Sequence, residues 1–431
     1  MIKTVRYNAG EPNSTLDRIR SRALDMNQAL VAQVGEIVEC VRSTGDEALV
    51  RFTKQFDDVD LDFHKLRVDP DFIRSTASRA DSRVVDAFRI AIANIRAFHE
   101  RQLESGWELA SEHGVVGQRI LPVASAGLYV PGGRAAYPST VVMNTIPAQV
   151  AGVKRIAIAT PPGSLEHNPT IAAVISELGI EEVYRIGGAQ AIAALAFGTP
   201  SIPRVDKIIG PGNVYVAIAK KLVFGVVGID SIAGPTEVVV IADHTADPRF
   251  VAADLLAQAE HDEAASSICI TTDAALAREV ASEVERQLAT LDRRSIAAAS
   301  IERYGAVFVV ESIEAGCELT NLIAPEHLEL MTENDARAAS LIENAGAIFF
   351  GPYSSEPVGD YIAGPNHVLP TLGTARFSSA LGVHDFIKRQ SIIRYSREAL
   401  SKNADAIATM AEAEGLTAHK RAVLLRTGDV S

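Results

Sequence analysis

Two side chains that can bind a metal, Gln258 and His261, stand close together at the end of a predicted helix. Asp247 is a good helix N-cap and Pro248 a good first helical residue, so the helix should run from there to about His261. The apolar stripe of this helix places Gln258 at the margin of the buried face, with His261 beside it. Buried polar groups need partners. By spacing alone, a hydrogen-bonded pair at a helix end is the more common arrangement, and a metal site is the alternative.

Glu326 and His327 form a second candidate site, because Glu and His are the usual proton-transfer groups near neutral pH. They stand just before an apparent strand, and adjacent residues on an extended chain point to opposite faces. Both can meet one substrate only if the segment bends, as Pro325 permits. A surface Glu–His pair is the alternative interpretation.

Polar residues late in the chain are less informative one by one. Asp360 lies in a loop rich in Gly, Pro and Ser, where polar side chains usually cap turns, and His367 follows it. His419 lies in the first turn of a predicted helix that Thr417 can cap. A helix N-terminus disfavours imidazolium, so His419 should stay neutral, as a metal ligand must. A solvated terminal histidine is the commoner outcome.

Three glycine-rich turns follow predicted strands in the middle of the chain, at 130–133, 186–190 and 210–213. In parallel sheets, ligands bind at the carboxyl ends of strands, so three such turns suggest a single crevice. None of them is the GxGxxG fingerprint, because Tyr215 stands where the third glycine of the last turn would be. Spacing therefore leaves both a structural turn and a ligand loop open.

The order of predicted elements indicates the fold class. Apolar spacing predicts helices over 14–42 and 81–103, and strands over 118–123 and 127–130. Strands and helices then alternate up to a late strand over 347–350, which is typical of parallel sheets covered on both faces. After Ser391 the chain should be helical to its end, with Gly415 between two helices. We expect two α/β layers with helical ends.

Composition excludes several classes of protein. The 431 residues carry a net charge of -13, which argues against nucleic acid as a partner. Cys40, Cys269 and Cys317 are widely spaced and odd in number, so neither a cysteine zinc site nor a disulfide framework is expected. Cys269 is the obvious nucleophile candidate, but it stands inside an apolar strand, and we reject thiol catalysis. With no signal peptide or membrane span in the sequence, we expect a cytoplasmic protein that binds no membrane.

Several motifs in this order resemble those of the histidinol dehydrogenase family, and the resemblance covers nearly the whole chain. They are Gly-Leu-Tyr-Val-Pro-Gly-Gly at 127–133, Lys-Ile-Ile-Gly-Pro-Gly-Asn at 207–213, Ala-Gly-Pro-Thr-Glu at 233–237, Gln-Ala-Glu-His-Asp at 258–262, Ala-Pro-Glu-His at 324–327 and Gly-Pro-Asn-His-Val-Leu-Pro at 364–370. The expected fold is α/β, with two Rossmann-like α/β domains of parallel sheets plus helical N-terminal and C-terminal segments. The expected parts are an N-terminal helical segment (1–27), a zinc and catalytic domain (28–124 and 237–380), an NAD-binding domain (125–236) and a C-terminal segment that contributes to a dimer (381–431).

The resemblance also implies the site. It places one Zn²⁺ per subunit on Gln258, His261, Asp360 and His419, with the segment that bears His419 reaching the site of the partner in a homodimer. The NAD positions are Tyr129, Gln190 and Asn213. The substrate positions are Thr236, Gln258, His261, His327, Asp360, His367, Glu414 and His419. Many relatives have Ser at the position of Thr236, a difference that keeps the hydroxyl.

The implied reaction is the oxidation of L-histidinol to L-histidine through L-histidinal with two NAD, the last steps of histidine biosynthesis. His327 would take the alcohol proton, and Glu326 would activate the water that adds to the aldehyde. The main rival is a paralogous zinc and NAD alcohol dehydrogenase that acts on another small polyol. A zinc hydrolase with Glu326 as its base, and a non-catalytic binding protein on the same fold, are the others.

Overall fold

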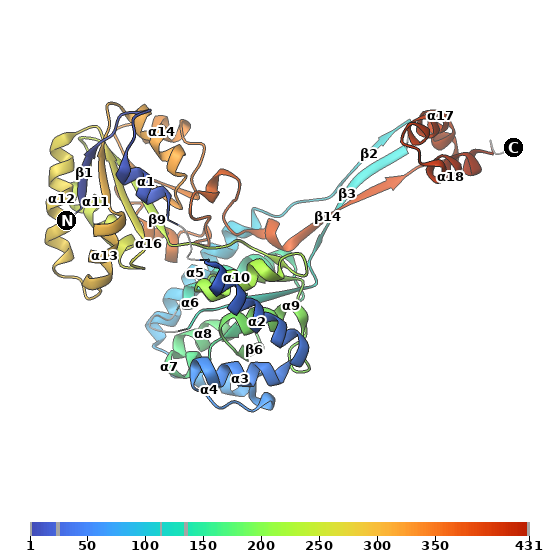
Figure 1. Cartoon of the computed structure of the whole chain (residues 1–431), viewed down its shortest axis with the longest axis horizontal. Helices are drawn as coiled ribbons and strands as arrows, with labels where there is room; N and C mark the ends of the chain where they lie inside the picture. The colour runs from blue at the N-terminus through green and yellow to red at the C-terminus, as the bar shows by residue number, and fades with distance from the viewer. Residues whose placement is uncertain (1, 23–25, 113, 133–136, 429–431) are drawn as a thin grey trace.

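The computed structural model describes residues 2–22, 26–112, 114–132 and 137–428. Two parallel sheets, each with helices on both faces, are followed by a long arm that projects from the body and carries the C-terminus (Figure 1). Gly133, in the first glycine-rich turn, lies outside the described residues. Within the described ranges, no helix has the length and apolar character needed to cross a membrane. The expected α/β class with parallel sheets is confirmed.

The first parallel sheet has six strands in the order β1-β11-β10-β9-β12-β13. These are β1 (Lys3–Arg6), β9 (Glu237–Ala242), β10 (Ser266–Thr271), β11 (Ala306–Val309), β12 (His327–Met331) and β13 (Ala347–Phe350). The strand β1 adds an edge to this sheet, so the N-terminal segment is not wholly helical as expected. Both faces are buried: Val238 and Val240 pack in one apolar cluster, and Val239 and Ile241 in another.

The helices of this layer include one over Glu356–Tyr361, so Asp360 lies in a helix and not in the loop that the sequence predicted. They are α1 (Ser14–Arg20), α11 (Pro248–Ala259), α12 (Ala274–Leu288), α13 (Arg294–Tyr304), α14 (Ile313–Ile323), α15 (Asp335–Ser340) and α16 (Glu356–Tyr361). The N-cap of α11 is Asp247, whose side chain accepts a hydrogen bond from the backbone N–H of Arg249 at 2.9 Å. Pro248 is the first residue of the helix, as predicted.

The second parallel sheet has five strands in the order β6-β5-β4-β7-β8. These are β4 (Ser125–Tyr129), β5 (Arg155–Thr160), β6 (Glu182–Arg185), β7 (Lys207–Ile209) and β8 (Gly228–Ile229). Its own helices are α6 (Pro138–Ala151), α7 (Ser164–His167), α8 (Pro169–Glu177), α9 (Gly188–Phe197) and α10 (Val214–Val223). In chain order, both this sheet and the six-stranded one without β1 have the Rossmann arrangement 3-2-1-4-5.

The helices before residue 101 pack on the five-stranded sheet, and not with residues 237–380 as expected from the sequence. They are α2 (Gln28–Thr44), α3 (Asp46–Asp57), the short 3-10 helix η1 (Phe63–Lys65), α4 (Pro70–Ala77) and α5 (Ser82–Glu100). Val34 and Leu49 share an apolar cluster with α9 and α10, and Ile73 and Ile95 share one with α6 and α8. The helices of the five-stranded layer cover these apolar faces. Periodicity predicts that each helix has a buried face, but it does not identify the layer that covers it.

An antiparallel ribbon, which the sequence analysis did not predict, forms the arm. It consists of β2 (Trp107–Ser111), β3 (Gly114–Pro122) and β14 (Ile387–Arg394), in the order β14-β3-β2. The ribbon leads to α17 (Arg397–Ala413) and α18 (Thr417–Thr427) at the far end (Figure 1). Helix therefore begins at Arg397, because residues up to Arg394 pair with β3. Gly415, at φ +72°, separates the two helices as predicted.

The segment after α16 connects the two layers. Asn366 donates a hydrogen bond from Nδ2 to the carbonyl oxygen of Met143 in α6 at 2.6 Å. Asn94 in α5 donates one to the carbonyl oxygen of Ile362 at 2.8 Å. Asn366 is buried and directly precedes His367, so the layer built on the five-stranded sheet lies next to the candidate site.

Candidate active site

The proton-transfer candidates lie at the amino ends of two neighbouring strands. His327 is the first residue of β12 and pairs in register with Val238 of β9. Glu326 stands just before β12, and Thr236 just before β9. Since β9 and β12 are parallel, their amino ends bring these residues from distant parts of the chain together.

Glu326 is held by the start of β9. Its Oε2 accepts hydrogen bonds from the hydroxyl of Thr236 and, at 3.0 Å, from the backbone N–H of Glu237. The side chain is buried, and burial raises the pKa of Glu326 above its usual range. A carboxyl group with a raised pKa can take up a proton near neutral pH, which suits a general base.

His327 is oriented by a backbone carbonyl. Its Nδ1 lies 3.1 Å from the carbonyl oxygen of Glu237, which can only accept, so Nδ1 carries the proton. The lone pair is then on Nε2, a buried atom without a hydrogen-bond partner among the described residues. Burial lowers the pKa of His327, but the carboxylates of Glu326, Glu356 and Asp360 outweigh it and leave the pKa raised. Nε2 is therefore positioned to accept a proton.

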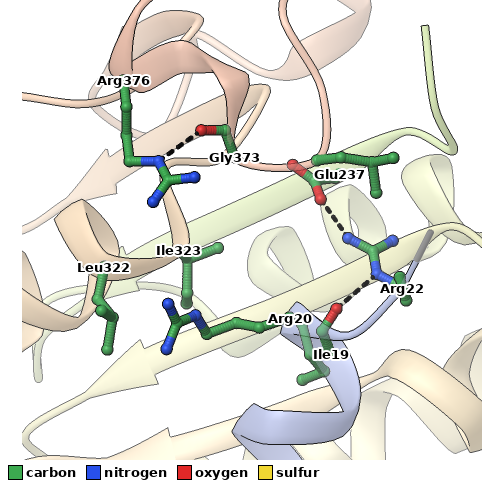
Figure 2. Close-up of a pocket in the computed structure, with 9 residues that line it drawn as sticks. Ile19, Arg20, Arg22, Glu237, Leu322, Ile323, Gly373 and Arg376 are labelled. Carbon is green, nitrogen blue, oxygen red and sulfur yellow. Dashed lines mark hydrogen bonds and ion pairs between the residues drawn. The ribbon is translucent and has the colours of Figure 1, made fainter.

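Arg22 binds the side chain of Glu237. The two side chains form a buried ion pair, and the Arg22 guanidinium also donates to the carbonyl oxygen of Ile19 at 3.1 Å (Figure 2). It donates to the carbonyl oxygen of Ala264 as well, at 2.9 Å. A cavity of about 90 Å³ lies beside this pair, and Arg20 and Arg376 contribute to its walls (Figure 2). Because the backbone of Glu237 contacts both Glu326 and His327, Arg22 stabilises the strand that positions them.

Gln258 is fully buried, with 0% of its surface exposed, and its amide contacts this same pair of strands. With the amide nitrogen turned toward Glu356, it donates to Glu356 Oε2 at 3.0 Å and to the carbonyl oxygen of Glu237 at 3.1 Å. The amide oxygen then lies 2.7 Å from the hydroxyl oxygen of Thr236. Gln258 thus connects α11 to the start of β9 and to α16.

His261, Glu356 and Asp360 form a cluster in which one donor atom from each lies within 4.8 Å of the others. His261 Nε2 is 3.6 Å from Glu356 Oε1, and the interaction with the Glu356 carboxylate is the main reason that the pKa of His261 is raised. Burial raises the pKa of Asp360. Imidazole nitrogen and carboxylate oxygen are common zinc ligands, so the donor set fits Zn²⁺.

Glu356 was missed as a functional residue by the sequence analysis, which placed it in a turn-rich loop. It starts α16, its side chain is 2% exposed, and its backbone N–H donates to Glu329 Oε1 at 2.8 Å. Burial and the neighbouring Asp254 raise the pKa of Glu329. The spacing of Glu356 and Asp360, on one short helix, was the only signal in the sequence.

His367 lies against the same helix. Its Nδ1 is 3.2 Å from the carbonyl oxygen of Asp360, and since a carbonyl only accepts, Nδ1 carries the proton. Burial lowers the pKa of His367, so the ring is neutral at pH 7. The structure therefore brings together Thr236, Gln258, Glu326, His327, Asp360 and His367, with His261 at the rim.

Glu414 and His419 lie elsewhere in the same chain. Both are exposed, at the end of α17 and in the first turn of α18, on the tip of the arm and far from α16 and β9 (Figure 1). The N-cap of α18 is Leu416 and not Thr417, which is the first helical residue and makes no capping hydrogen bond. These two side chains can join a site of this kind only on another copy of the chain.

The expected nucleotide positions lie at the carboxyl ends of the five-stranded sheet. The hydroxyl of Tyr129, the last residue of β4, accepts a hydrogen bond from the N–H of Gly188 at 3.0 Å, which joins the first two glycine-rich turns. Gln190 is buried in the first turn of α9. Asn213 caps α10, accepting from the N–H groups of Tyr215 and Val216 at 3.1 and 3.2 Å. The turn before α10 therefore presents a helix N-terminus, which favours anions.

Comparison with known proteins gives one consistent family. The histidinol dehydrogenase family profile matches residues 20–427. The chain is 54% identical to a histidinol dehydrogenase of Halalkalibacterium halodurans, over 96% of this chain and 97% of that protein. It is 50% identical to one of Synechococcus, over 99% of both. The crystal structure of a histidinol dehydrogenase from Elizabethkingia anophelis superposes with a TM-score of 0.92 at 39% identity, covering 99% of this chain and 98% of that one.

Proposed function

The chain belongs to the histidinol dehydrogenase family of oxidoreductases, and we propose that it oxidises L-histidinol to L-histidine through L-histidinal. Two NAD molecules would each accept one hydride, and each subunit would hold one Zn²⁺. The observation that carries the proposal is the position of Glu326 and His327 beside the cluster of His261, Glu356 and Asp360, with His327 Nε2 unpaired among the described residues.

Gln258, His261 and Asp360 would hold the zinc within one chain, and His419 of the partner subunit would complete the set. The cluster of exposed His261, buried Glu356 and half-buried Asp360 supports this assignment, because two carboxylates held close together favour a cation between them. When bound, the zinc would supply a Lewis acid that fixes the imidazole and amino nitrogens of the substrate. Thr236, His367 and Glu414 of the partner subunit would contact the substrate around it, together with the ligands and His327.

His327 would act as the base for the alcohol. Its Nδ1–H is committed to the carbonyl oxygen of Glu237, so Nε2 would accept the alcohol proton, and NAD, when bound, would supply the hydride acceptor. Glu326 would serve in the second oxidation, taking a proton from the water that adds to the aldehyde. Its contacts with Thr236 and the Glu237 N–H fix the carboxylate for this role.

The glycine-rich turns would bind NAD, with Tyr129, Gln190 and Asn213 as contacts. Support comes from their place at the carboxyl edge of a sheet with Rossmann strand order. Glycine is required there: a Cβ on Gly187 would lie 2.7 Å from Cγ of Pro161, and Gly188 has φ +63°.

A homodimer with shared sites would place the arm on the partner. The arm exposes large apolar side chains, among them Trp107, Leu109, Ile393 and Met410, which is typical of a surface that another chain covers. We further propose that the protein acts in the last steps of histidine biosynthesis in the cytoplasm.

Steady-state assays with purified protein test the proposal: L-histidinol should give two NADH per L-histidine formed. A different small polyol as the better substrate would favour a paralogous dehydrogenase, and substrate hydrolysis without NAD would favour a zinc hydrolase.

The zinc assignment is tested by His261→Asn. This variant should lose its metal on dialysis, whereas the unaltered chain keeps one zinc. One zinc per chain in the dialysed variant, by elemental analysis, would remove His261 from the ligand set.

A further inference from the structure

Lys220 and Asp230 form a buried ion pair beneath the third glycine-rich turn. Lys220 comes from α10, and Asp230 directly follows β8. Their side chains are only 3% and 5% exposed. A buried ion pair contributes little net stability, because the loss of hydration offsets the attraction between the charges. A role in positioning is therefore the better explanation for this pair.

The pair holds both polar groups of one glycine. Lys220 Nζ donates to the carbonyl oxygen of Gly210 at 3.0 Å, and the N–H of Gly210 donates to Asp230 Oδ2 at 2.8 Å. Gly210 has φ +121°, and a Cβ at this position would overlap the carbonyl oxygen of Tyr129. The ion pair thus fixes a turn that packs directly against Tyr129.

The three turns are linked through this contact. Tyr129 touches Gly210 with its carbonyl group and accepts from the N–H of Gly188 with its hydroxyl. Asn213, after the Gly210 turn, caps α10, the helix that carries Lys220. A shift of Gly210 would therefore move the first residues of α10 and the support of Tyr129 together.

The charges of the pair also matter for an anionic ligand. A lone Asp230 beneath the turn would repel a pyrophosphate, and Lys220 neutralises that charge at the same spot. We propose that Lys220 and Asp230 are positioning residues for the dinucleotide, which hold the Gly210 turn in the shape that NAD binds. This inference rests on the proposed function, since it takes NAD as the ligand of these turns.

Calorimetry with NAD and three variants tests the pair. Lys220→Met leaves Asp230 unpaired and should raise the Kd of NAD on the order of tenfold to a hundredfold. Lys220→Met with Asp230→Asn removes both charges and keeps an acceptor for the Gly210 N–H. The Kd of NAD for this double variant should therefore lie between that of the unaltered chain and that of Lys220→Met. Lys221→Met removes an exposed charge from the same helix and should leave the Kd unchanged.

A KM-against-kcat comparison separates positioning from a general loss of structure. In the double variant, the KM for NAD should rise while kcat, zinc content and the KM for histidinol stay within about twofold of the unaltered chain. If Lys220→Met does not fold, this double variant alone decides. An unchanged KM for NAD, or equal losses in zinc and histidinol binding, would overturn the positioning role. Failure of the unaltered chain to bind NAD would instead overturn the proposed function.

Discussion

The two parallel sheets have the same strand order but carry their candidate sites at opposite edges, one at the carboxyl ends of its strands and the other at the amino ends. In the five-stranded sheet, the glycine-rich turns follow the carboxyl ends of β4, β6 and β7. In the six-stranded sheet, Thr236, Glu326 and His327 lie at the amino ends of β9 and β12. The rule that ligands bind at carboxyl ends accounts for the first edge only. Strand order therefore does not determine where a site forms.

The two edges also differ in what they bury. The edge of the six-stranded sheet, together with α11 and α16, buries the carboxyl groups of Glu237, Asp254, Glu326, Glu329 and Glu356. The turns of the five-stranded sheet offer backbone groups, a helix N-terminus and one neutralised ion pair. The first environment suits a cation and proton transfer, and the second suits an anion. Because the two sites lie at different edges, a substitution that impairs one of them should leave ligand binding at the other unchanged.

The largest effect is expected for Glu326→Gln. The variant keeps an oxygen near Thr236 but cannot take a proton, so histidinal oxidation should slow by about 10²- to 10⁴-fold. Histidinol oxidation should slow much less, because His327 supplies its base. Single-turnover assays started from histidinol and from histidinal separate the two steps. Equal losses in both would refute the division of labour, and the Kd of NAD should not change.

Glu356→Gln should weaken zinc binding by about 10- to 100-fold, because groups that orient metal ligands have effects of this size. Glu356 accepts from the amide of Gln258 and contacts His261, and the variant loses its charge at both places. Asp254→Asn is the matched control, since Asp254 is buried nearby on α11 and is absent from the His261–Glu356–Asp360 cluster. Competition with a chromophoric chelator measures both. Equal zinc affinities in the two variants would contradict the role of Glu356.

Gly210→Ala compared with Gly225→Ala examines the other edge. Both glycines have a positive φ, +121° and +99°, but a Cβ on Gly225 meets nothing within 4 Å. Gly225→Ala should therefore cost only backbone strain, about 1–3 kcal/mol of unfolding free energy, and leave the Kd of NAD unchanged. Gly210→Ala adds overlap with Tyr129 and should lower both stability and NAD affinity. Urea unfolding and calorimetry measure the pair, and identical effects would show that the turn does not need this shape.

The sequence predicted most elements but not their assembly. The helix from Pro248 and the strand at 347–350 follow from local spacing, and both are confirmed. The ribbon could not be predicted, because β14 pairs with β3 over a separation of about 270 residues, visible in the hydrogen bond between Arg119 and Gln390. Likewise, the helices of 28–100 have apolar faces that fit either sheet, and only packing decides between them.

Only some residues of the candidate site could be predicted from the sequence, and the reason is physical. Glu326 and His327 are adjacent, so the pattern of residue types was visible without the fold. Glu356 gains its significance from contacts with Gln258, in α11, and with His261, just after α11, almost a hundred residues earlier. The role of such residues can be identified only from the fold, in which β9 and β12 are neighbours and bring these segments together.

The smallest effect is a pH dependence of stability that belongs to the six-stranded edge. Burial raises the pKa of Glu237 to about 7 from the ordinary 4.5, and burial also raises the pKa of Asp254 and Glu329. These three groups then hold protons in the folded state that the unfolded state has already lost. Their contribution to the stability of the metal-free protein should therefore be complete below pH 4.5 and should fall as the pH rises through about 7. Glu329→Gln keeps an acceptor for the Glu356 N–H and should make this decline shallower, as urea unfolding at several pH values would measure. Stability that rises over this range, or an equal slope in the variant, would mean that these carboxyl groups are not the source.

Zinc should reduce the decline because it favours the ionised carboxylates around it, whereas NAD, bound at the other edge, should stabilise the protein without changing the slope.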